Sequence, residues 1–323
     1  MSQQEATSHF NQQHKHGQHI HNADQTFTKE NSSRYENPSL RLMLKANCNA
    51  ILSYDSSNQP PDTIEAVVGD YAKPEFGLTE EEYLLKPNDP DVSPIFKSKK
   101  PIKMLDFACG TGLLDYYLAS YLPENSEIVG VDISRNQLDI FEKRLDRFQA
   151  KNPTLKVKLA EFDILNEEFN KKRNLSLPKE LQENAFDLII CSISYHHFHD
   201  VKGITKKLKT YLKPQGDLII LDFYDGQEQA FPDDPDPVHA VAHHGGFSPE
   251  VLKSLFTEIG FSKVKAGISY KFNVWMRKDV ILGHLPHDRV NHVINVAKTQ
   301  YNEDRKELEY LVERSMSISV CTK

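Results

Sequence analysis

Short apolar segments alternate with helical patterns through the middle of the chain. From Ile102 onward, five continuous apolar segments read as strands buried on both faces: IKMLDFA, EIVGVDI, VKLAEFDI, FDLIICSIS and DLIILDF. Apolar residues at helical spacing fall between them in LLDYYLASYL, residues 134–148 and ITKKLKTYL. Ser134 with Gln137, and Ser248 with Pro249, are signals for helix starts. This alternation predicts βαβ units and a parallel sheet.

The flanking regions are less regular and suggest how the chain is organised. Residues 1–25 are polar and histidine-rich, which predicts a disordered tail. We expect one domain over 26–323. Its parts are divided by the positions of helical apolar patterns, proline-rich stretches and late apolar segments. These parts are N-terminal lid helices (26–54), an insertion (55–101), the core (102–278), a helical insertion (279–313) and a final strand (314–323).

Two late strands, KVKAGISYKFNVWM and the C-terminal segment, complete the predicted sheet. No sheet-covering helix separates them, so we expect them to pair in an antiparallel manner at an edge. The predicted fold class is therefore α/β. It is a doubly wound, mostly parallel seven-stranded sheet of Rossmann-like type, with an antiparallel edge strand and helical additions.

Composition narrows the class of protein. The 323 residues include 39 Lys and Arg against 46 Asp and Glu, for a formal charge of −7, which argues against a nucleic-acid partner. The four cysteines lack disulfide-framework or zinc-finger spacing. No apolar run approaches the about 20 residues of a membrane span. We expect a cytoplasmic protein, and a nuclear location remains open.

The first strand ends in a glycine turn that bears on ligand type. In LDFACGTG, Gly110 and Gly112 let backbone approach a ligand closely. A dinucleotide fingerprint would place a third glycine where Asp115 stands, and a carboxylate there faces a pyrophosphate badly. The turn therefore favours a ligand without phosphates over NAD.

Acidic residues follow three successive strands. Asp132 closes the second strand, where a carboxylate can accept hydrogen bonds from both hydroxyls of a ribose. Asp163 ends the third strand, where it could accept from an adenine amino group, and Asp106 belongs to the first. Because carboxyl ends of parallel strands meet at one crevice, these side chains are expected to converge.

These segments together resemble the successive motifs of class I S-adenosylmethionine-dependent methyltransferases. LDFACGTG, GVDIS, AEFDI, FDLIICSISYHH and LKPQGDLIILDF carry the resemblance over about residues 102–264. It implies that the methionine part of S-adenosylmethionine is surrounded by Asp106, Ala108, Gly110 and Gly112. It also implies that Asp132 and Ile133 bind the ribose and adenine, and that Asp163 and Ile164 bind the adenine. Ala108 stands where many members have glycine.

Two segments outside these motifs also resemble parts of known methyltransferases. FTKENSSRY followed by Asn37-Pro38 is similar to the N-terminal segment of small-molecule methyltransferases near the ubiquinone-biosynthesis branch, although Ser32 and Glu36 depart from its pattern. That segment folds over the cofactor in the family, which makes Tyr35 a candidate cofactor-binding lid residue. HAVAHHGGF, residues 239–247, resembles a stretch that faces the substrate crevice.

Histidines after the fourth strand are the candidate catalytic groups. His196, His197 and, further on, His244 could act as a general base or orient the acceptor near neutral pH. Imidazoles can also bind zinc, but no spacing among the histidines demands a metal, so none is predicted. Asp222 and Tyr224, at the end of the fifth strand, could line the acceptor pocket.

We therefore expect an enzyme that transfers a methyl group from S-adenosylmethionine to a small-molecule acceptor. The methylated atom and the oligomeric state are left open. Two alternatives also remain open: a methyltransferase acting on protein side chains, which an acidic surface suits when the substrate is basic, and a non-catalytic cofactor-binding subunit that activates a partner.

Overall fold

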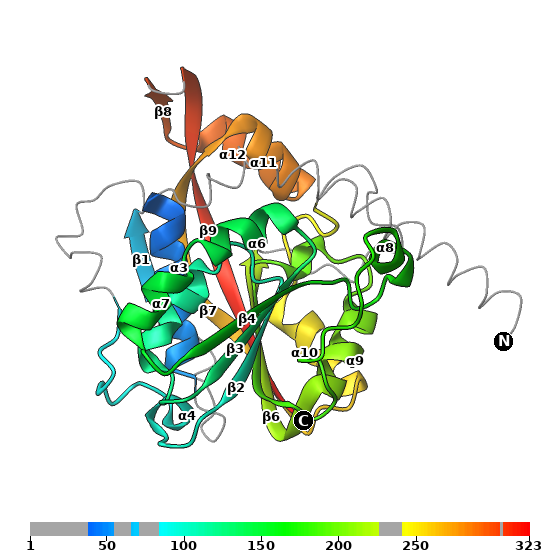
Figure 1. The fold of residues 1–323 in the computed structure, drawn as a ribbon. Coiled ribbons are helices and arrows are strands. Elements are labelled where there is room, and N and C mark those ends of the chain that lie inside the picture. Colours follow the sequence, from blue (N-terminus) through cyan, green and yellow to red (C-terminus); the bar gives the residue numbers. More distant parts are fainter. Residues whose placement is uncertain (1–37, 55–65, 71–83, 226–240, 304–305) are drawn as a thin grey trace, which may run out of the picture.

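The computed structural model describes residues 38–54, 66–70, 84–225, 241–303 and 306–323. The expected tail (1–25), Tyr35 and much of the 55–101 segment lie outside these residues. Figure 1 shows a twisted sheet with helices on both faces and a separate group of helices at one end. The α/β fold class predicted from the sequence is confirmed.

The sheet contains nine strands within the described ranges, two more than predicted. Their order is β1-β7-β9-β6-β5-β2-β3-β4, with β8 paired to β9. The antiparallel strand β9 lies inside the sheet, between β6 and β7. The strands are β1 (Ala66–Asp70), β2 (Lys103–Phe107), β3 (Glu127–Asp132), β4 (Lys156–Glu161), β5 (Phe186–Ser192), β6 (Leu212–Tyr224), β7 (Lys263–Arg277), β8 (Thr299–Asn302) and β9 (Glu307–Thr322).

Helices cover both faces of the sheet. They are α3 (Pro38–Leu52), α4 (Pro94–Lys97), α5 (Leu113–Leu118), α6 (Arg135–Glu142), α7 (Leu145–Lys151), α8 (Glu167–Lys172), α9 (Val201–Tyr211), α10 (Pro249–Glu258), α11 (Lys278–His284) and α12 (His287–Val296). Two short 3₁₀ turns, η3 (Ala119–Tyr121) and η4 (Tyr195–His197), complete the set.

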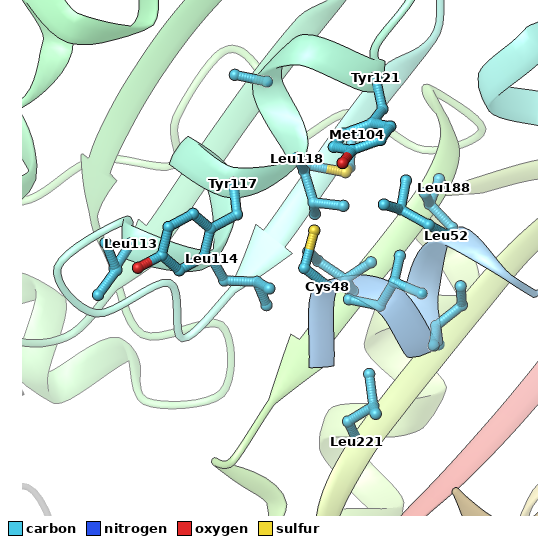
Figure 2. Close-up of a cluster of buried hydrophobic side chains, with 14 of the residues drawn as sticks. Cys48, Leu52, Met104, Leu113, Leu114, Tyr117, Leu118, Tyr121, Leu188 and Leu221 are labelled. Carbon is cyan, nitrogen blue, oxygen red and sulfur yellow. The ribbon is translucent and has the colours of Figure 1, made fainter. Parts of the chain in front are cut away.

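Strand residues alternate between two hydrophobic cores. On β2, Met104 belongs to a core with α3 and α5, whereas Leu105 belongs to a core with α9 and α10. Figure 2 shows the first core, in which Cys48 and Leu52 of α3 face Leu118 of α5 and the strands beneath. Burial on both faces is why the central strands read as unbroken apolar runs.

A buried asparagine fastens α3 to the sheet. Asn47 is fully buried, and its Nδ2 donates to Ser192 Oγ over 3.0 Å. Tyr270 of β7 donates its hydroxyl hydrogen to Asn47 Oδ1 over 2.6 Å. One side chain thus joins an N-terminal helix to the end of β5 and to β7.

The C-terminal part of the chain extends the sheet beyond its helices. Strands β7 and β9 pair from Lys263 with Thr322 to Arg277 with Glu309. Helices α11 and α12 pack on their outer halves through Met276, Ile281, Leu285, Val290, Val293, Tyr310 and Val312. Strand β8 lies beyond these helices at the tip (Figure 1). We call α11, α12, β8 and the outer halves of β7 and β9 the C-terminal lobe.

Several elements differ from the pattern expected from the sequence. The stretch expected as a helix from residue 134 is two helices, α6 and α7, divided around Arg144, whose guanidinium donates to the carbonyl of Thr111. Strand β6 begins at Leu212 and so includes residues expected to form the loop after α9. The 279–313 segment contains β8 and part of β9 as well as helices.

Replacing the buried asparagine should destabilise the fold. We expect Asn47→Ala to lower the free energy of unfolding by about 1–3 kcal/mol, because it removes the hydrogen bond to Ser192 Oγ and the shorter of the two hydrogen bonds that the Tyr270 hydroxyl donates. Urea denaturation measures the change. Ser53→Ala, just after the same helix, is the control, and its exposed hydroxyl should matter by less than about 0.5 kcal/mol. Equal effects of the two substitutions would contradict this account.

Candidate active site

The glycine turn after β2 is held against β3 by its own backbone. Ala108 N and Cys109 N both donate to Val131 O, and Gly110 N donates to Asp132 Oδ2 over 2.8 Å. Gly110 and Gly112 have φ of 55° and 67°, in the left-handed region that suits glycine. A Cβ on Gly112 would lie 2.4 Å from the Phe141 ring, so this glycine is needed for packing against α6.

Asp132 stands where the turn and β3 meet. Its Oδ1 accepts from Ser134 N over 2.8 Å, so the carboxylate bridges both loops. Burial raises the pKa of Asp132 to about 6, although the backbone N–H groups that donate to it oppose this rise. A carboxylate that accepts two hydrogen bonds still has lone pairs for further donors.

A cleft with about 950 Å³ of empty space, part of it open to solvent, lies over this turn. Asp106, Ala108, Gly110, Asp132 and Ile133, five of the candidate cofactor-binding residues, line this cleft, whereas Gly112 lies outside the lining. Helix α3 contributes Leu44. The remaining lining residues are Cys109, Thr111, Leu113, Leu114, Gln137, Ser192, Ile193, Ser194, His197 and Phe198.

A second, smaller hollow adjoins the cleft. It has about 410 Å³ of empty space and shares Ala108, Asp132, Ile133 and Phe198 with the larger one. Asp163 and Ile164 line it, together with apolar residues that include Phe162. The structure thus brings together the acidic residues at the ends of β3 and β4.

Asp163 also organises its own loop. Its Oδ1 accepts from Leu165 N over 2.9 Å and from Asn166 N over 3.1 Å. Asn170 of α8 bonds both the N–H and the carbonyl of Asp163. These contacts fix the loop that forms one wall of the smaller hollow.

The turn after β5 is a part of the site that sequence reasoning missed. Ile193 has φ of 58°, a left-handed conformation that a β-branched side chain rarely adopts. Its N–H donates to Leu221 O over 2.7 Å, which holds the turn in place. Ser192, Ile193 and Ser194 all line the cleft. The serines carried no periodic signal that would have singled them out.

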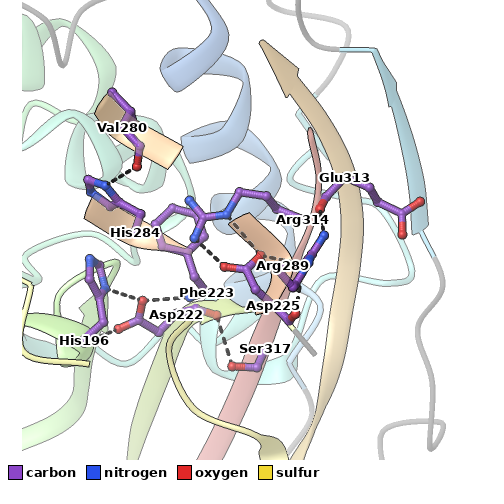
Figure 3. Close-up of polar contacts among 10 residues, drawn as sticks. All are labelled: His196, Asp222, Phe223, Asp225, Val280, His284, Arg289, Glu313, Arg314 and Ser317. Atoms are coloured by element: carbon purple, nitrogen blue, oxygen red, sulfur yellow. Dashed lines mark hydrogen bonds and ion pairs between the residues drawn. The ribbon is translucent and has the colours of Figure 1, made fainter. Parts of the chain in front are cut away.

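The candidate catalytic histidines occupy different places. His197 is partly exposed and lines the cleft. His196 lies behind it and is only 3% exposed. The centroids of the two imidazole rings are 4.0 Å apart. Figure 3 shows the His196 ring directed at Asp222, with Nδ1 2.7 Å from Oδ1. Asp222 Oδ2 also accepts from His196 N over 2.9 Å.

This pairing changes the expected role of Asp222. The carboxylate is fully buried and lies outside the cleft lining, so it anchors His196 instead of contacting an acceptor there. Because a carboxylate only accepts, Nδ1 of His196 carries a proton in this contact.

His244 belongs to a loop that packs on η4 and lies outside the cleft lining. In this loop, Ala242 N and His243 N both donate to His196 O over 2.9 Å. Burial lowers the pKa of His243 to about 4 and that of His284, in α11, to about 3. These two imidazoles are therefore neutral near pH 7.

A second buried acid joins the sheet to the C-terminal lobe. Asp225, just past β6, accepts from Arg314 of β9 over 2.8 Å and from Arg289 of α12 (Figure 3). The Arg314 guanidinium also lies 3.7 Å from the centre of the Phe223 ring. These contacts attach α12 beside the residues that hold His196.

The described residues contain neither a metal-binding cluster nor a membrane-spanning helix. Within these ranges, no three His, Cys, Asp or Glu side chains are grouped so that they could hold a metal ion. In the same ranges, no helix is long and apolar enough to cross a membrane.

Comparison with known proteins places the chain in a family. Residues 81–266 match the family described as a methyltransferase domain. An uncharacterized methyltransferase of Schizosaccharomyces pombe, C1347.09, is 28% identical over 253 residues, which are 77% of this chain and 82% of that one. The 2-phytyl-1,4-naphtoquinone methyltransferase of Trichormus variabilis is 29% identical over 127 residues, 39% of this chain and 49% of the relative.

Among solved structures, the YcgJ protein of Bacillus subtilis aligns with 71% of this chain and 97% of its own, at 18% identity and a TM-score of 0.42. The family match covers more than half of the chain and includes the glycine turn, Asp132, Asp163 and the histidines after β5. The chain belongs to the methyltransferase-domain family, and it is an S-adenosylmethionine-dependent methyltransferase of class I.

Proposed function

We propose that this enzyme methylates a small-molecule acceptor held beside His197. The observation that carries the proposal is the pair of adjoining hollows that meet at Asp132, with His197 on the wall of the larger one. Leu44 of α3 lines the same cleft, so a helix as well as the strand ends contributes to it. Concave, mostly apolar sites of this kind suit small ligands.

The residues at the site fit S-adenosylmethionine. Asp132 has lone pairs left for the ribose hydroxyls after its two backbone contacts. Gln137 Oε1 is buried in the cleft and has no hydrogen-bond partner among the described residues, which leaves an acceptor for a ligand donor. A Cβ on Gly110 would meet nothing closer than this oxygen, at 3.8 Å, so the ligand has room beside the turn.

The smaller hollow suits the adenine. Phe162 and Ile164 supply apolar walls, and Asp163 supplies a carboxylate at the edge. Tyr35, which the family resemblance suggests as a lid residue, lies outside the described residues and stays a prediction.

When bound, S-adenosylmethionine supplies a methyl group already activated by its sulfonium, so the protein's main contribution is alignment of the acceptor and exclusion of water. A base is needed only where the acceptor must lose a proton. His197 is placed to take that proton because it lines the cleft, and His196, fixed by Asp222, supports its ring from behind. His196 and His244 do not line the cleft, so we rank them below His197 as candidates for the general base.

The acceptor class is supported by some relatives with named activities. Matching proteins are called 2-phytyl-1,4-naphtoquinone methyltransferase and demethylmenaquinone methyltransferase, names that denote quinone acceptors. Their alignments cover 39% and 36% of this chain, so they support the class of acceptor and not its identity.

Transfer of labelled methyl groups tests the proposal. The purified enzyme is incubated with labelled S-adenosylmethionine and cell extract, and the products are separated by filtration. We expect label in the small-molecule filtrate. Label in macromolecules alone would instead favour a protein side-chain methyltransferase. A stable partner protein without any turnover would favour a non-catalytic subunit.

Loss of the Asp132 carboxylate should weaken cofactor binding. We expect Asp132→Asn to raise the Kd for S-adenosylmethionine about 10- to 100-fold, the loss expected for hydrogen bonds to a charged group. Isothermal titration calorimetry measures the change. Asp146→Asn, on the exposed side of α7, is the matched control and should bind as the wild type does. Unchanged affinity in Asp132→Asn would refute this assignment.

Loss of His197 should affect transfer more than cofactor binding. We expect His197→Ala to slow label transfer about 100-fold or more if the acceptor must lose a proton, while the Kd for S-adenosylmethionine changes little. The exposed His292 of α12 offers a control, His292→Ala, that should transfer at the wild-type rate. Full transfer by His197→Ala would show that this imidazole is not the base.

A further inference from the structure

The C-terminal lobe carries most of the exposed apolar surface that the structure describes. Among the described residues, five large apolar side chains are exposed, and four of them lie in this lobe. They are Leu282 of α11, Val296 of α12, Tyr301 of β8 and Leu308 of β9, each between 45% and 63% exposed. Single exposed apolar residues are normal on a protein surface, whereas their concentration on one part of the molecule marks a contact site.

The exposed pair Tyr301 and Leu308 continues the hydrophobic core of the lobe. The two residues lie directly opposite one another on β8 and β9, so their side chains share a face of the sheet. Tyr310, two positions along β9, lies on the same face and clusters with buried residues of α11 and α12. The core of the lobe therefore extends at the tip into an apolar strip that these helices do not cover.

Strand β8 also presents a free backbone edge within the described part of the chain (Figure 1). It pairs with β9 alone among the described strands. Leu311 N donates to Lys298 O over 2.9 Å, so the backbone groups of Lys298 and of every second residue after it face β9. Those of Thr299 and Tyr301 therefore face outward, where their N–H and C=O groups can pair with another strand.

The polar face of β8 holds the strand in place. Gln300 Nε2 donates to Glu309 Oε2 over 3.0 Å, and Asn302 Nδ2 donates to Glu309 Oε1 over 3.1 Å. These side-chain contacts add to the backbone pairing of β8 with β9. The outer edge of β8 is therefore a formed strand and not a frayed end of the chain.

The charges at the two ends of β8 are opposite in sign. Lys298 precedes the strand and Glu303 follows it, and both side chains are exposed. A second β8 that runs antiparallel to the first brings each charged end beside the oppositely charged end of the other copy. A parallel copy would instead bring like charges together, which is unfavourable. The charge pattern of β8 therefore complements an antiparallel copy of itself.

We propose that two copies of this chain associate through their β8 strands. The copies are related by a two-fold axis that passes between their Gln300 residues, which places Thr299 of each copy opposite Tyr301 of the other. Residues in such a hydrogen-bonded pair exchange both backbone bonds, so the outward N–H and C=O groups of Thr299 and Tyr301 are all satisfied. The Tyr301 ring then packs against a β-branched side chain, a favourable pair across strands.

This contact uses the same surface of both copies, as two-fold homodimers do. It joins the two sheets edge to edge and covers the apolar strip at the tip of each lobe. The proposal goes beyond the proposed function and does not depend on it, because no residue of β8 lines the cofactor cleft. Failure of the one therefore leaves the other untouched.

Sedimentation of the full chain over a dilution series measures the association. We expect an equilibrium between monomer and dimer, with the dimer detectable at protein concentrations below about 100 μM. A monomer throughout the series would overturn the proposal. Leu177→Ser removes the exposed large apolar side chain that the structure describes outside the lobe. This matched control should dimerise as the wild type does.

Substitutions at the charged ends test the antiparallel arrangement. Lys298→Glu and Glu303→Lys each turn two attractive end contacts into repulsive ones, so we expect each to raise the dimer Kd about tenfold or more. An equimolar mixture of the two variants should dimerise as the wild type does, because each end contact then joins opposite charges. Wild-type association of either variant alone, or failure of the mixture to associate, would overturn the proposal.

A proline tests the backbone contact. Tyr301→Pro removes an N–H that faces away from β9 and places a ring at the outer edge, so it should abolish the dimer while β8 stays paired with β9. Melting followed by circular dichroism shows whether the variant remains folded, and the charge variants decide the question if it does not. A dimer that persists in folded Tyr301→Pro would mean that the copies meet at another surface, and it would overturn the proposal.

Discussion

The hydrogen bond from Gly110 N to Asp132 joins the turn after β2 to the end of β3, and both hollows of the site meet at that point. Two further backbone bonds, from Ala108 N and Cys109 N to Val131 O, tie the glycine turn to β3. The carboxylate is therefore a structural clamp, and in the proposed cofactor site it is also a ligand group. The donors from both loops stabilise its charge, which its partly buried position disfavours.

Two further buried acids, at the carboxyl end of β6, also hold separate elements together. Asp222 holds the η4 turn through both the backbone and the ring of His196, and Asp225 holds two arginines from later elements. Each acid is satisfied by groups from distant parts of the chain, as buried charges in proteins generally are. The turn that carries His197 is thus fixed by polar contacts, whereas α3 and α5, which also line the cleft, are held by apolar packing and by the Asn47 side chain.

The sequence predicts what depends on local periodicity and strand order. Continuous apolar runs identified the central strands, and the rule that parallel strands end at one edge brought Asp106, Asp132 and Asp163 together. It did not reveal contacts between residues far apart in the chain. Asn47 and Ser192 lie 145 positions apart, and His196 and Asp222 lie 26 apart, so neither pairing leaves a periodic trace. The division between α6 and α7 likewise depends on Arg144 reaching Thr111, which helical spacing alone cannot show.

The long strands β7 and β9 have a mechanical consequence. They run from the middle of the sheet into the C-terminal lobe as one paired ribbon, of 15 and 16 residues, without a loop between the two regions. A hinge needs a few residues that can absorb a large backbone rotation, and this ribbon is paired throughout except for a register shift between Ile268 and Tyr270. Displacement of the lobe would therefore bend β9 and load its neighbour β6, the strand that carries Asp222.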